Sequence, residues 1–375
     1  MTATDPAVSH AAAIPAPGHS RPARPRTSSW LPTWDMITTK NLEIRKRRGL
    51  MITLVILIVV PTVLVLGLRL LFHLIAPATN GPAGSPDVFQ QLTNLTAEFG
   101  FIAAAALGAA AGTTDLSDGV FRHLVITGRS RLALYLARIP AALAILLPLV
   151  ALAFTLSCLV TAYAGIPDPT TVALYGLNVP THLSQTGLEN WLLQHPQQAL
   201  NGLPVPGNAT PADVSQAIHQ DIGSYYADYN ASAIANANPA INEMAKIGLW
   251  LELEAFIGFI VGLGLGSLTG QRTSSTNILI ALEIIITPIL SRNQIPYFLN
   301  GQRLIVGVAM TQLRPAGLAP ATQGGGGGGP GHILFGGRGA LGIPPMPTWA
   351  MISVIVGWIV IWSALGAYRM ITRDA

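Results

Sequence analysis

Charge is scarce in this chain of 375 residues, of which only 10% are Asp, Glu, Lys or Arg while 50% are apolar. Soluble domains usually carry about 25% charged residues. The mean hydropathy of +0.49 points the same way. Too few charged groups are present to cover a water-exposed surface of this size, which excludes an ordinary soluble domain and indicates a membrane protein.

Cysteine is nearly absent as well, because Cys158 is the only one and lies in an apolar run. The chain can therefore form no internal disulfide and no paired-cysteine metal site. Residues 1–30 contain no apolar stretch that could serve as the core of a cleavable signal peptide. We therefore expect the N-terminus to stay in the cytoplasm.

Motifs of the common enzymes are missing too. A nucleotide-binding Walker A loop requires a lysine directly after a glycine, and none of the three lysines follows one. The glycine run Gly324–Gly329 is interpreted as a linker. Neither the H-E-x-x-H metal motif nor the G-x-S-x-G nucleophile motif occurs. His182, His195 and His219 are widely spaced, which favours solvated surface histidines over a metal site. We expect no catalytic residue, no metal and no nucleic acid partner.

Long apolar runs dominate the remainder of the chain. About 20 apolar residues in a helix cross a hydrocarbon core of about 30 Å. Runs that approach or exceed this length predict an all-α membrane protein with six spans, at about 49–75, 92–112, 132–162, 247–269, 277–290 and 349–368. The fifth run is the shortest. The second is rich in Ala and Gly, which allow close helix contact, so we expect it to pack inside the bundle.

Basic residues give these spans a direction. The cluster Arg45–Arg48 precedes the first span, and Arg369 and Arg373 follow the last. Because Lys and Arg concentrate on the cytoplasmic side, both termini are expected in the cytoplasm of a multi-pass protein of a bacterial inner membrane. Range 163–244 holds six acidic residues and no Lys or Arg. We interpret it as an extracytoplasmic domain with short helical stretches such as Pro211–Tyr229.

Two segments flank the spans. Range 1–29 is rich in proline and reads as a disordered tail. In range 30–48, Trp30, Trp34, Ile37 and Ile44 recur at helical spacing, which favours an interfacial amphipathic elbow helix over an ordinary juxtamembrane linker.

An insertion at 291–347 separates the last two spans. Its apolar stretch Asn300–Leu313 is too short to cross, so a re-entrant or interfacial helix is expected there. If this stretch did cross, the basic C-terminal end would lie outside. We reject that topology.

Ionisable residues within the spans are the candidate intramembrane sites, because charge inside a bilayer is costly. Glu252 and Glu254 lie two residues apart in the fourth span and so on different helix faces. Glu283 and Arg138 lie at similar depths in the fifth and third spans, where they could form an ion pair. The alternative for these acids is that some of them line a transport path.

The loop between the second and third spans has the most distinctive pattern, Asp115-Leu-Ser-Asp-Gly-Val-Phe-Arg-His-Leu-Val-Ile-Thr-Gly-Arg-Ser-Arg131. It resembles the first cytoplasmic loop of ABC-2 type transporter permeases, in which an acidic residue precedes a Gly-Thr-hydrophobic-Arg turn by four positions. The residues at the positions of that pattern are Asp115, Gly119, Phe121, Arg122, Leu124, Ser130, Arg131 and Arg138. Asp115 stands in place of a glutamate, Val120 of a threonine and Arg138 of a lysine.

The resemblance implies the transmembrane subunit of an exporter that works as a homo- or heterodimer of permeases. This chain would bind no cofactor, and ATP and Mg would be held by a separate ATPase subunit. The loop would dock on that ATPase as a coupling helix, with Phe121 and Leu124 buried in a cleft and Arg122, Arg129 and Arg131 paired with acids on its rim. The simpler alternative is an arginine-rich loop that only sets topology.

Two rival functions remain open. An ion-coupled secondary transporter would use Glu252, Glu254 or Glu283 to carry protons. A non-transporting membrane scaffold would bind a partner through its domain at 163–244.

The high content of Ala, Gly and Pro is typical of an actinobacterial protein.

Overall fold

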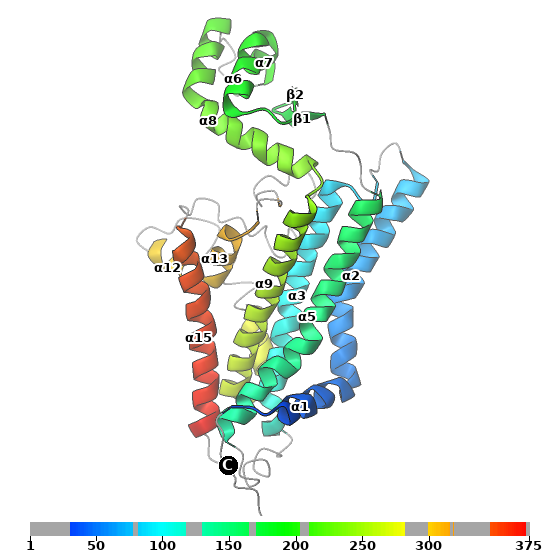
Figure 1. The fold of residues 1–375 in the computed structure, drawn as a ribbon, viewed down its shortest axis with the longest axis vertical. Helices are drawn as coiled ribbons and strands as arrows, with labels where there is room; N and C mark the ends of the chain where they lie inside the picture. The colour runs from blue at the N-terminus through cyan, green and yellow to red at the C-terminus, as the bar shows by residue number, and fades with distance from the viewer. Residues whose placement is uncertain are drawn as a thin grey trace, which may run out of the picture.

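The computed structural model describes residues 31–77, 82–117, 130–164, 170–202, 210–281, 299–315, 318 and 346–372. Figure 1 shows a long helical bundle with a small domain at one end. The bundle holds α1 (Trp34–Lys46), α2 (Arg48–Ile75), α3 (Pro86–Ser117), α5 (Arg131–Ala164), α9 (Ile241–Thr269), α10 (Arg272–Ile280), α12 (Leu299–Arg303), α13 (Val306–Gln312) and α15 (Thr348–Thr372). The small domain holds β1 (Thr171–Leu174), β2 (Leu177–Pro180), α6 (Gln185–Gln194), α7 (Pro196–Gly202) and α8 (Pro211–Asn236).

Within these described ranges, five helices are long and apolar enough to cross a membrane: α2, α3, α5, α9 and α15. The chain is therefore a mainly helical, multi-pass membrane protein. Five of the six expected spans fall within these helices. The remaining one, the fifth span at 277–290, begins in α10, and most of it lies outside the described residues.

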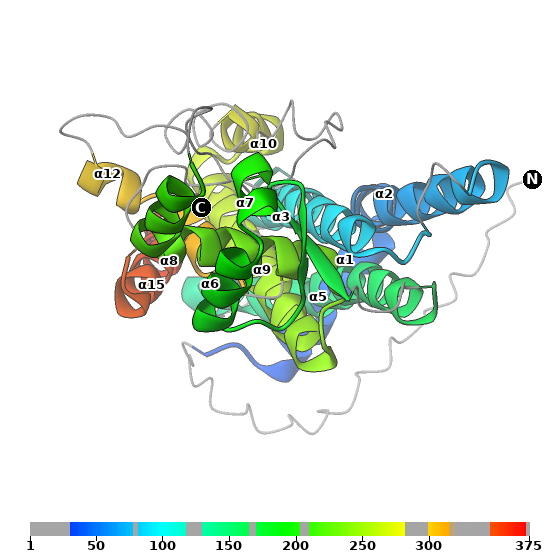
Figure 2. The ribbon, with the colours of Figure 1, turned by 90° about the horizontal axis from the view of Figure 1, so that it is seen from above.

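The five helices differ in how much of their surface the protein covers. The apolar stretches of α3 and α9 are mostly buried, whereas only 22%, 33% and 17% of the residues in those of α2, α5 and α15 are buried. Viewed from above, α3 and α9 lie between the outer helices α2 and α15 (Figure 2). The expectation that the Ala- and Gly-rich second span packs inside the bundle is thus confirmed.

Small residues hold α3 against α9. Gly258, Gly262 and Gly266 recur every fourth residue on α9, which places them on one helix face. A methyl group added at Gly262 would lie 2.1 Å from the carbonyl oxygen of Ala105, and one at Gly266 would lie 2.6 Å from that of Ala109. The backbones therefore approach so closely that no side chain fits between them.

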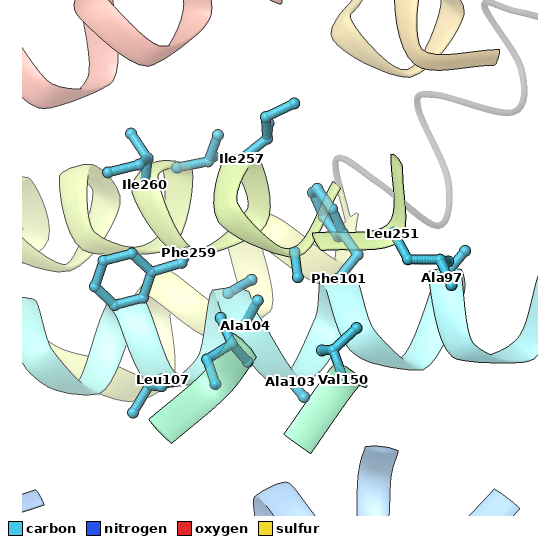
Figure 3. Packing of buried hydrophobic residues seen from close by; sticks show 14 of the residues in the cluster. Ala97, Phe101, Ala103, Ala104, Leu107, Val150, Leu251, Ile257, Phe259 and Ile260 are labelled. Carbon is cyan, nitrogen blue, oxygen red and sulfur yellow. The ribbon is translucent and has the colours of Figure 1, made fainter. Parts of the chain in front are cut away.

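The contact is reciprocal and extends along much of both helices. A methyl group at Gly108 would lie 2.1 Å from the Phe259 carbonyl oxygen, and one at Gly112 would lie 2.8 Å from that of Leu263. Residue numbers rise together on the two helices, so α3 and α9 run parallel. Larger apolar side chains, among them Leu107 and Phe259, fill the space around this contact (Figure 3).

Helix α15 joins the pair at one end, where a methyl group added at Gly366 of α15 would lie 3.2 Å from the Cα of Gly264 in α9. At the opposite end, the Trp250 indole N–H donates to the carbonyl oxygen of Met310 in α13 at 3.1 Å, and the Met346 N–H donates to Gln312 at 2.9 Å. The glycines lie toward the C-terminal ends of their helices, while Trp250 and Met346 lie toward or before the N-terminal ends. Helices α9 and α15 therefore run in the same direction.

Helix α1 lies across the end of the bundle where α9 finishes (Figure 1). Its buried residues are Met36 and Ile44, and the Asn41 side-chain amide donates to the carbonyl oxygen of Ala141 in α5 at 2.7 Å. Trp34, which the sequence placed on the same stripe as Ile44, is 75% exposed. Residues of the same stripe therefore differ in burial, because α1 packs one face against α5 and leaves another face exposed.

The small domain has an apolar core of its own, built from both strands and from α6, α7 and α8. Strands β1 and β2 form an antiparallel hairpin, which the sequence interpretation did not include. Tyr175 and Gly176 join the strands with φ of 51° and 85°, the positive values that a two-residue type I′ turn requires.

Polar contacts fasten this hairpin to α8, which is longer than the expected stretch Pro211–Tyr229. The buried Tyr229 hydroxyl donates to the Pro180 carbonyl oxygen at 2.8 Å and accepts from the Leu183 N–H at 3.0 Å. The Tyr175 hydroxyl donates to Asp228. Burial and the Asp228 carboxylate raise the pKa of Tyr175 to about 12.

Replacing Gly262 by alanine should destabilise the bundle, because the new methyl group would clash with the Ala105 backbone. We expect a loss of about 1–3 kcal/mol in the free energy of unfolding, measured by denaturation in mixed detergent micelles. Gly357→Ala is the matched control, since nothing lies within 4 Å of a methyl group there. Equal losses in the two variants would contradict the close-packing interpretation.

The start of α8 should lose protection at acid pH. The Thr210 N–H and hydroxyl donate to the Asp213 carboxylate at 2.8 and 2.7 Å, which lowers its pKa below the ordinary 3.8. Because the folded pKa is the lower one, this capping contribution is complete above the unfolded pKa and is lost as pH falls through the folded value. Amide protection factors in the first turn of α8 should fall with pH in the wild type. The acid step should be absent in Asp213→Asn, and a similar step in that variant would exclude Asp213 as its source.

Candidate functional site

The loop with the distinctive pattern leaves the bundle at the α1 end, between the last turn of α3 and the start of α5. Asp115 belongs to the backbone of α3, but its side chain lies outside the described residues, as do Gly119, Phe121, Arg122, Leu124 and Arg129. Their roles in docking stay predictions. The structure does describe the point where the chain enters α5.

Ser130 and Arg131 anchor that entry point. The Ser130 hydroxyl accepts from the Ala133 N–H at 3.1 Å, which caps the first turn of α5. The Arg131 guanidinium donates to the carbonyl oxygen of Ile371 at 2.8 Å, near the C-terminal end of α15. A cation at this end of a helix is favourable, because the last carbonyls carry partial negative charge. Arg131 therefore joins the loop to α15, a contact that the sequence did not indicate.

Arg138 is buried two turns into α5, with 2% of its surface exposed. Its guanidinium donates to the carbonyl oxygen of Gly112 in α3 at 3.3 Å. Gly112 also lies in the contact between α3 and α9. The expected partner Glu283 lies outside the described residues, so the ion pair stays a prediction.

A cavity of about 430 Å³, which we call the basal cavity, opens beside these residues. Its lining comes from three places: the junction of α1 and α2, the last turns of α3, and the turn from α9 into α10. The lining residues are Arg47, Leu50, Ala110, Thr113, Thr114, Gly270, Gln271 and Thr273. Gly270 ends α9 with a φ of 69°, a backbone conformation that glycine adopts without strain.

A narrow second cavity adjoins the basal cavity and shares Arg47 with it. It reaches between α1, α3 and α5, and its charged lining consists of Lys40, Glu43, Arg47 and Arg138. Glu43 lies 2.8 Å from the Lys40 ammonium and 3.5 Å from the Arg47 guanidinium. The lining of the second cavity thus includes three cations and one carboxylate.

The acids of the fourth span lie near the middle of α9, because this helix begins at Ile241, before the expected start at 247. Glu254 is buried with 2% of its surface exposed, and Glu252 is half-buried. The expectation that the two lie on different faces agrees with this difference in burial.

Arg314 follows α13 and was not among the sequence candidates. Its guanidinium lies 5.9 Å from the ring centre of Trp250 in α9 and donates to Asn94 of α3 at 2.8 Å. The Trp358 indole N–H of α15 donates to the Leu304 carbonyl oxygen, between α12 and α13, at 2.8 Å. The short helices are thus fastened to three long ones. The sequence signal that could have indicated this contact is that Arg314 has no acidic neighbour within the insertion at 291–347.

Two of the three histidines of the small domain make local contacts. His195 stacks on Trp191 with ring centres 4.4 Å apart, and His219 lies 2.7 Å from Glu189. His182 has a φ of 65° at the exit from the hairpin. Over the described ranges, no group of three or more His, Cys, Asp or Glu could hold a metal ion.

Comparison with known proteins returned no matching family, no similar curated protein and no similar solved structure.

Proposed function

We propose that this chain is the membrane-spanning permease subunit of an ABC-2 type transporter that exports its substrate and is driven by a separate ATPase subunit. The observation that carries the proposal is the loop at 115–131, whose residue pattern resembles the family's coupling loop and whose two ends lie at the α1 end of the bundle. A second permease subunit would complete the path between the two halves.

The directions of the long helices support six crossings. Helices α9 and α15 run the same way, with α13 beside the N-terminal part of each. Thr269 and Val306 therefore lie toward opposite ends of the bundle, as a fifth span at 277–290 would require. Six crossings place both termini on one side, together with the loop and the basic cluster Arg45–Arg48.

Helix α1 suits the role of an elbow helix. It lies across the end of the bundle, buries Met36 and Ile44 against the protein, and leaves Trp34 and Leu42 exposed. Exposed apolar side chains on a helix with many charges are typical of a helix that lies in the lipid headgroup region. The short helices α12 and α13 likewise suit the expected re-entrant insertion.

The contacts at the loop's base suit transmission of force. Ser130 fixes the start of α5, Arg131 joins it to α15, and Arg138 joins α5 to α3. A push on the loop would therefore reach three long helices at once. In the proposed cycle, ATP binding and hydrolysis in the partner move this base and switch the access of the pathway.

Acidic substitutions in the loop should break the complex with the ATPase. The full chain is co-expressed with an ATPase encoded beside it, and we expect co-purification to fall at least about tenfold in Phe121→Glu and Arg122→Glu, because each removes a docking contact. Arg369→Glu, at the same end of the bundle, is the control and should retain the ATPase. Transport that persists without any ATPase and collapses with a proton uncoupler would overturn the proposal.

The burial of Glu254 favours a second candidate, a proton-coupled secondary transporter. An ionisable group inside a bundle is costly and is characteristic of proton carriers. In that case, Glu254 would take up and release a proton during each transport cycle, while half-buried Glu252 would not be required.

Proton flux in liposomes separates the two candidates. If Glu254 carries protons, a substrate gradient across the membrane of liposomes that contain the purified chain should drive proton flux. A pH-sensitive dye inside the liposomes reports this flux. That flux should vanish in Glu254→Gln and persist in Glu252→Gln. Under the ATPase-driven proposal, the chain alone should give no flux, and both variants should behave like the wild type.

A further inference from the structure

We propose that the basal cavity binds the phosphate of an anionic phospholipid headgroup, with Arg47 as the main cationic contact. This site is independent of the ATPase and of the transported substrate, so it stands or falls separately from the proposed function. The inference follows from three observations: the charge of the cavity lining, the hydrogen bonds that its threonine hydroxyls already make, and the exposed apolar surface of α2 near it.

The lining charge favours an anion. Arg47 lines both cavities, and Lys40 and Arg138 extend the positive charge inward from it. Glu43 is the one carboxylate among the described lining side chains, so the net charge there is positive. Basic pockets between membrane helices bind lipid headgroups in this way. Glu43 would compete with a phosphate for Lys40 and Arg47, since it lies within 4 Å of both.

Two threonines of the lining use their hydroxyl protons within their own helix. The Thr113 hydroxyl donates to the Ala109 carbonyl oxygen at 2.9 Å, and the Thr114 hydroxyl donates to that of Ala110 at 2.7 Å. These hydroxyl protons are already used within α3. Arg47 beside these occupied hydroxyls favours a ligand that carries negative charge, as a phosphate does.

The position of the cavity selects a lipid over a soluble phosphate. Arg47 directly precedes α2, a helix that can cross the membrane, so it lies where the apolar span begins. The first turns of α2 leave Ile52, Val55 and Ile56 exposed, by 58%, 39% and 52%. A phosphate at Arg47 thus has exposed apolar helix surface about one and a half to two and a half turns further along α2 for its acyl chains. A soluble phosphate would make no use of that surface.

Native mass spectrometry of the full chain in detergent tests the site. The probes are phosphatidylglycerol, zwitterionic phosphatidylcholine and soluble glycerol 3-phosphate. We expect the wild type to retain phosphatidylglycerol selectively, and Arg47→Gln to weaken that binding about fivefold, the effect of one basic residue near a membrane surface. Glu43→Gln should bind phosphatidylglycerol more tightly, because the competing carboxylate is gone.

Arg369→Gln is the matched control, because Arg369 is an exposed cation in the last turn of α15 and does not line either cavity. It should bind phosphatidylglycerol as the wild type does. An equal loss in Arg369→Gln would assign the binding to diffuse surface charge and overturn the site. Displacement of the lipid by an equal concentration of glycerol 3-phosphate would show a soluble phosphate ligand and overturn the lipid assignment. Thermal unfolding of each variant confirms that the fold is intact.

Discussion

The close parallel contact between α3 and α9 is the constraint on which the other helices depend. In a bilayer, apolar side chains gain little by leaving lipid for protein, so helices associate through close packing and polar contacts rather than through the hydrophobic effect. Gly108 and Gly112 on one helix and Gly258, Gly262 and Gly266 on the other remove the side chains that would hold the two backbones apart. The outer helices then pack around a rigid pair.

The two ends of this pair carry different chemistry. At the α1 end, Arg47, Lys40 and Arg138 gather around the last turns of α3, where a cationic cavity opens. At the other end, Arg314 fastens α13 to α3 and α9, and the small domain with its own core follows. Positive charge thus occurs at both ends of the bundle, and at the α1 end it lines a cavity of about 430 Å³.

Several features could be predicted from the sequence because their signals are local. Apolar runs fixed five of the spans, and the Ala- and Gly-rich composition of the second span predicted its burial. The hairpin was missed because its strands are only four residues long, and Tyr175, which adopts a positive φ, is a residue that rarely does so. The sequence could not show that Ile44 packs on the protein while Trp34 stays exposed, because helical periodicity identifies a stripe but cannot say which neighbour covers it.

The sequence by itself determined that this is a membrane protein and roughly where the chain crosses the bilayer. It also determined which loop resembles a docking element. Hydropathy, charge and motif are properties of contiguous residues, so the sequence alone displays them. Tertiary structure alone decided which helices touch. Arg131 reaches Ile371 and Arg138 reaches Gly112 because the fold brings together segments far apart in the chain. The basal cavity likewise exists only once the α1–α2 junction, the last turns of α3 and the turn after α9 meet, because none of the three segments forms a cavity alone.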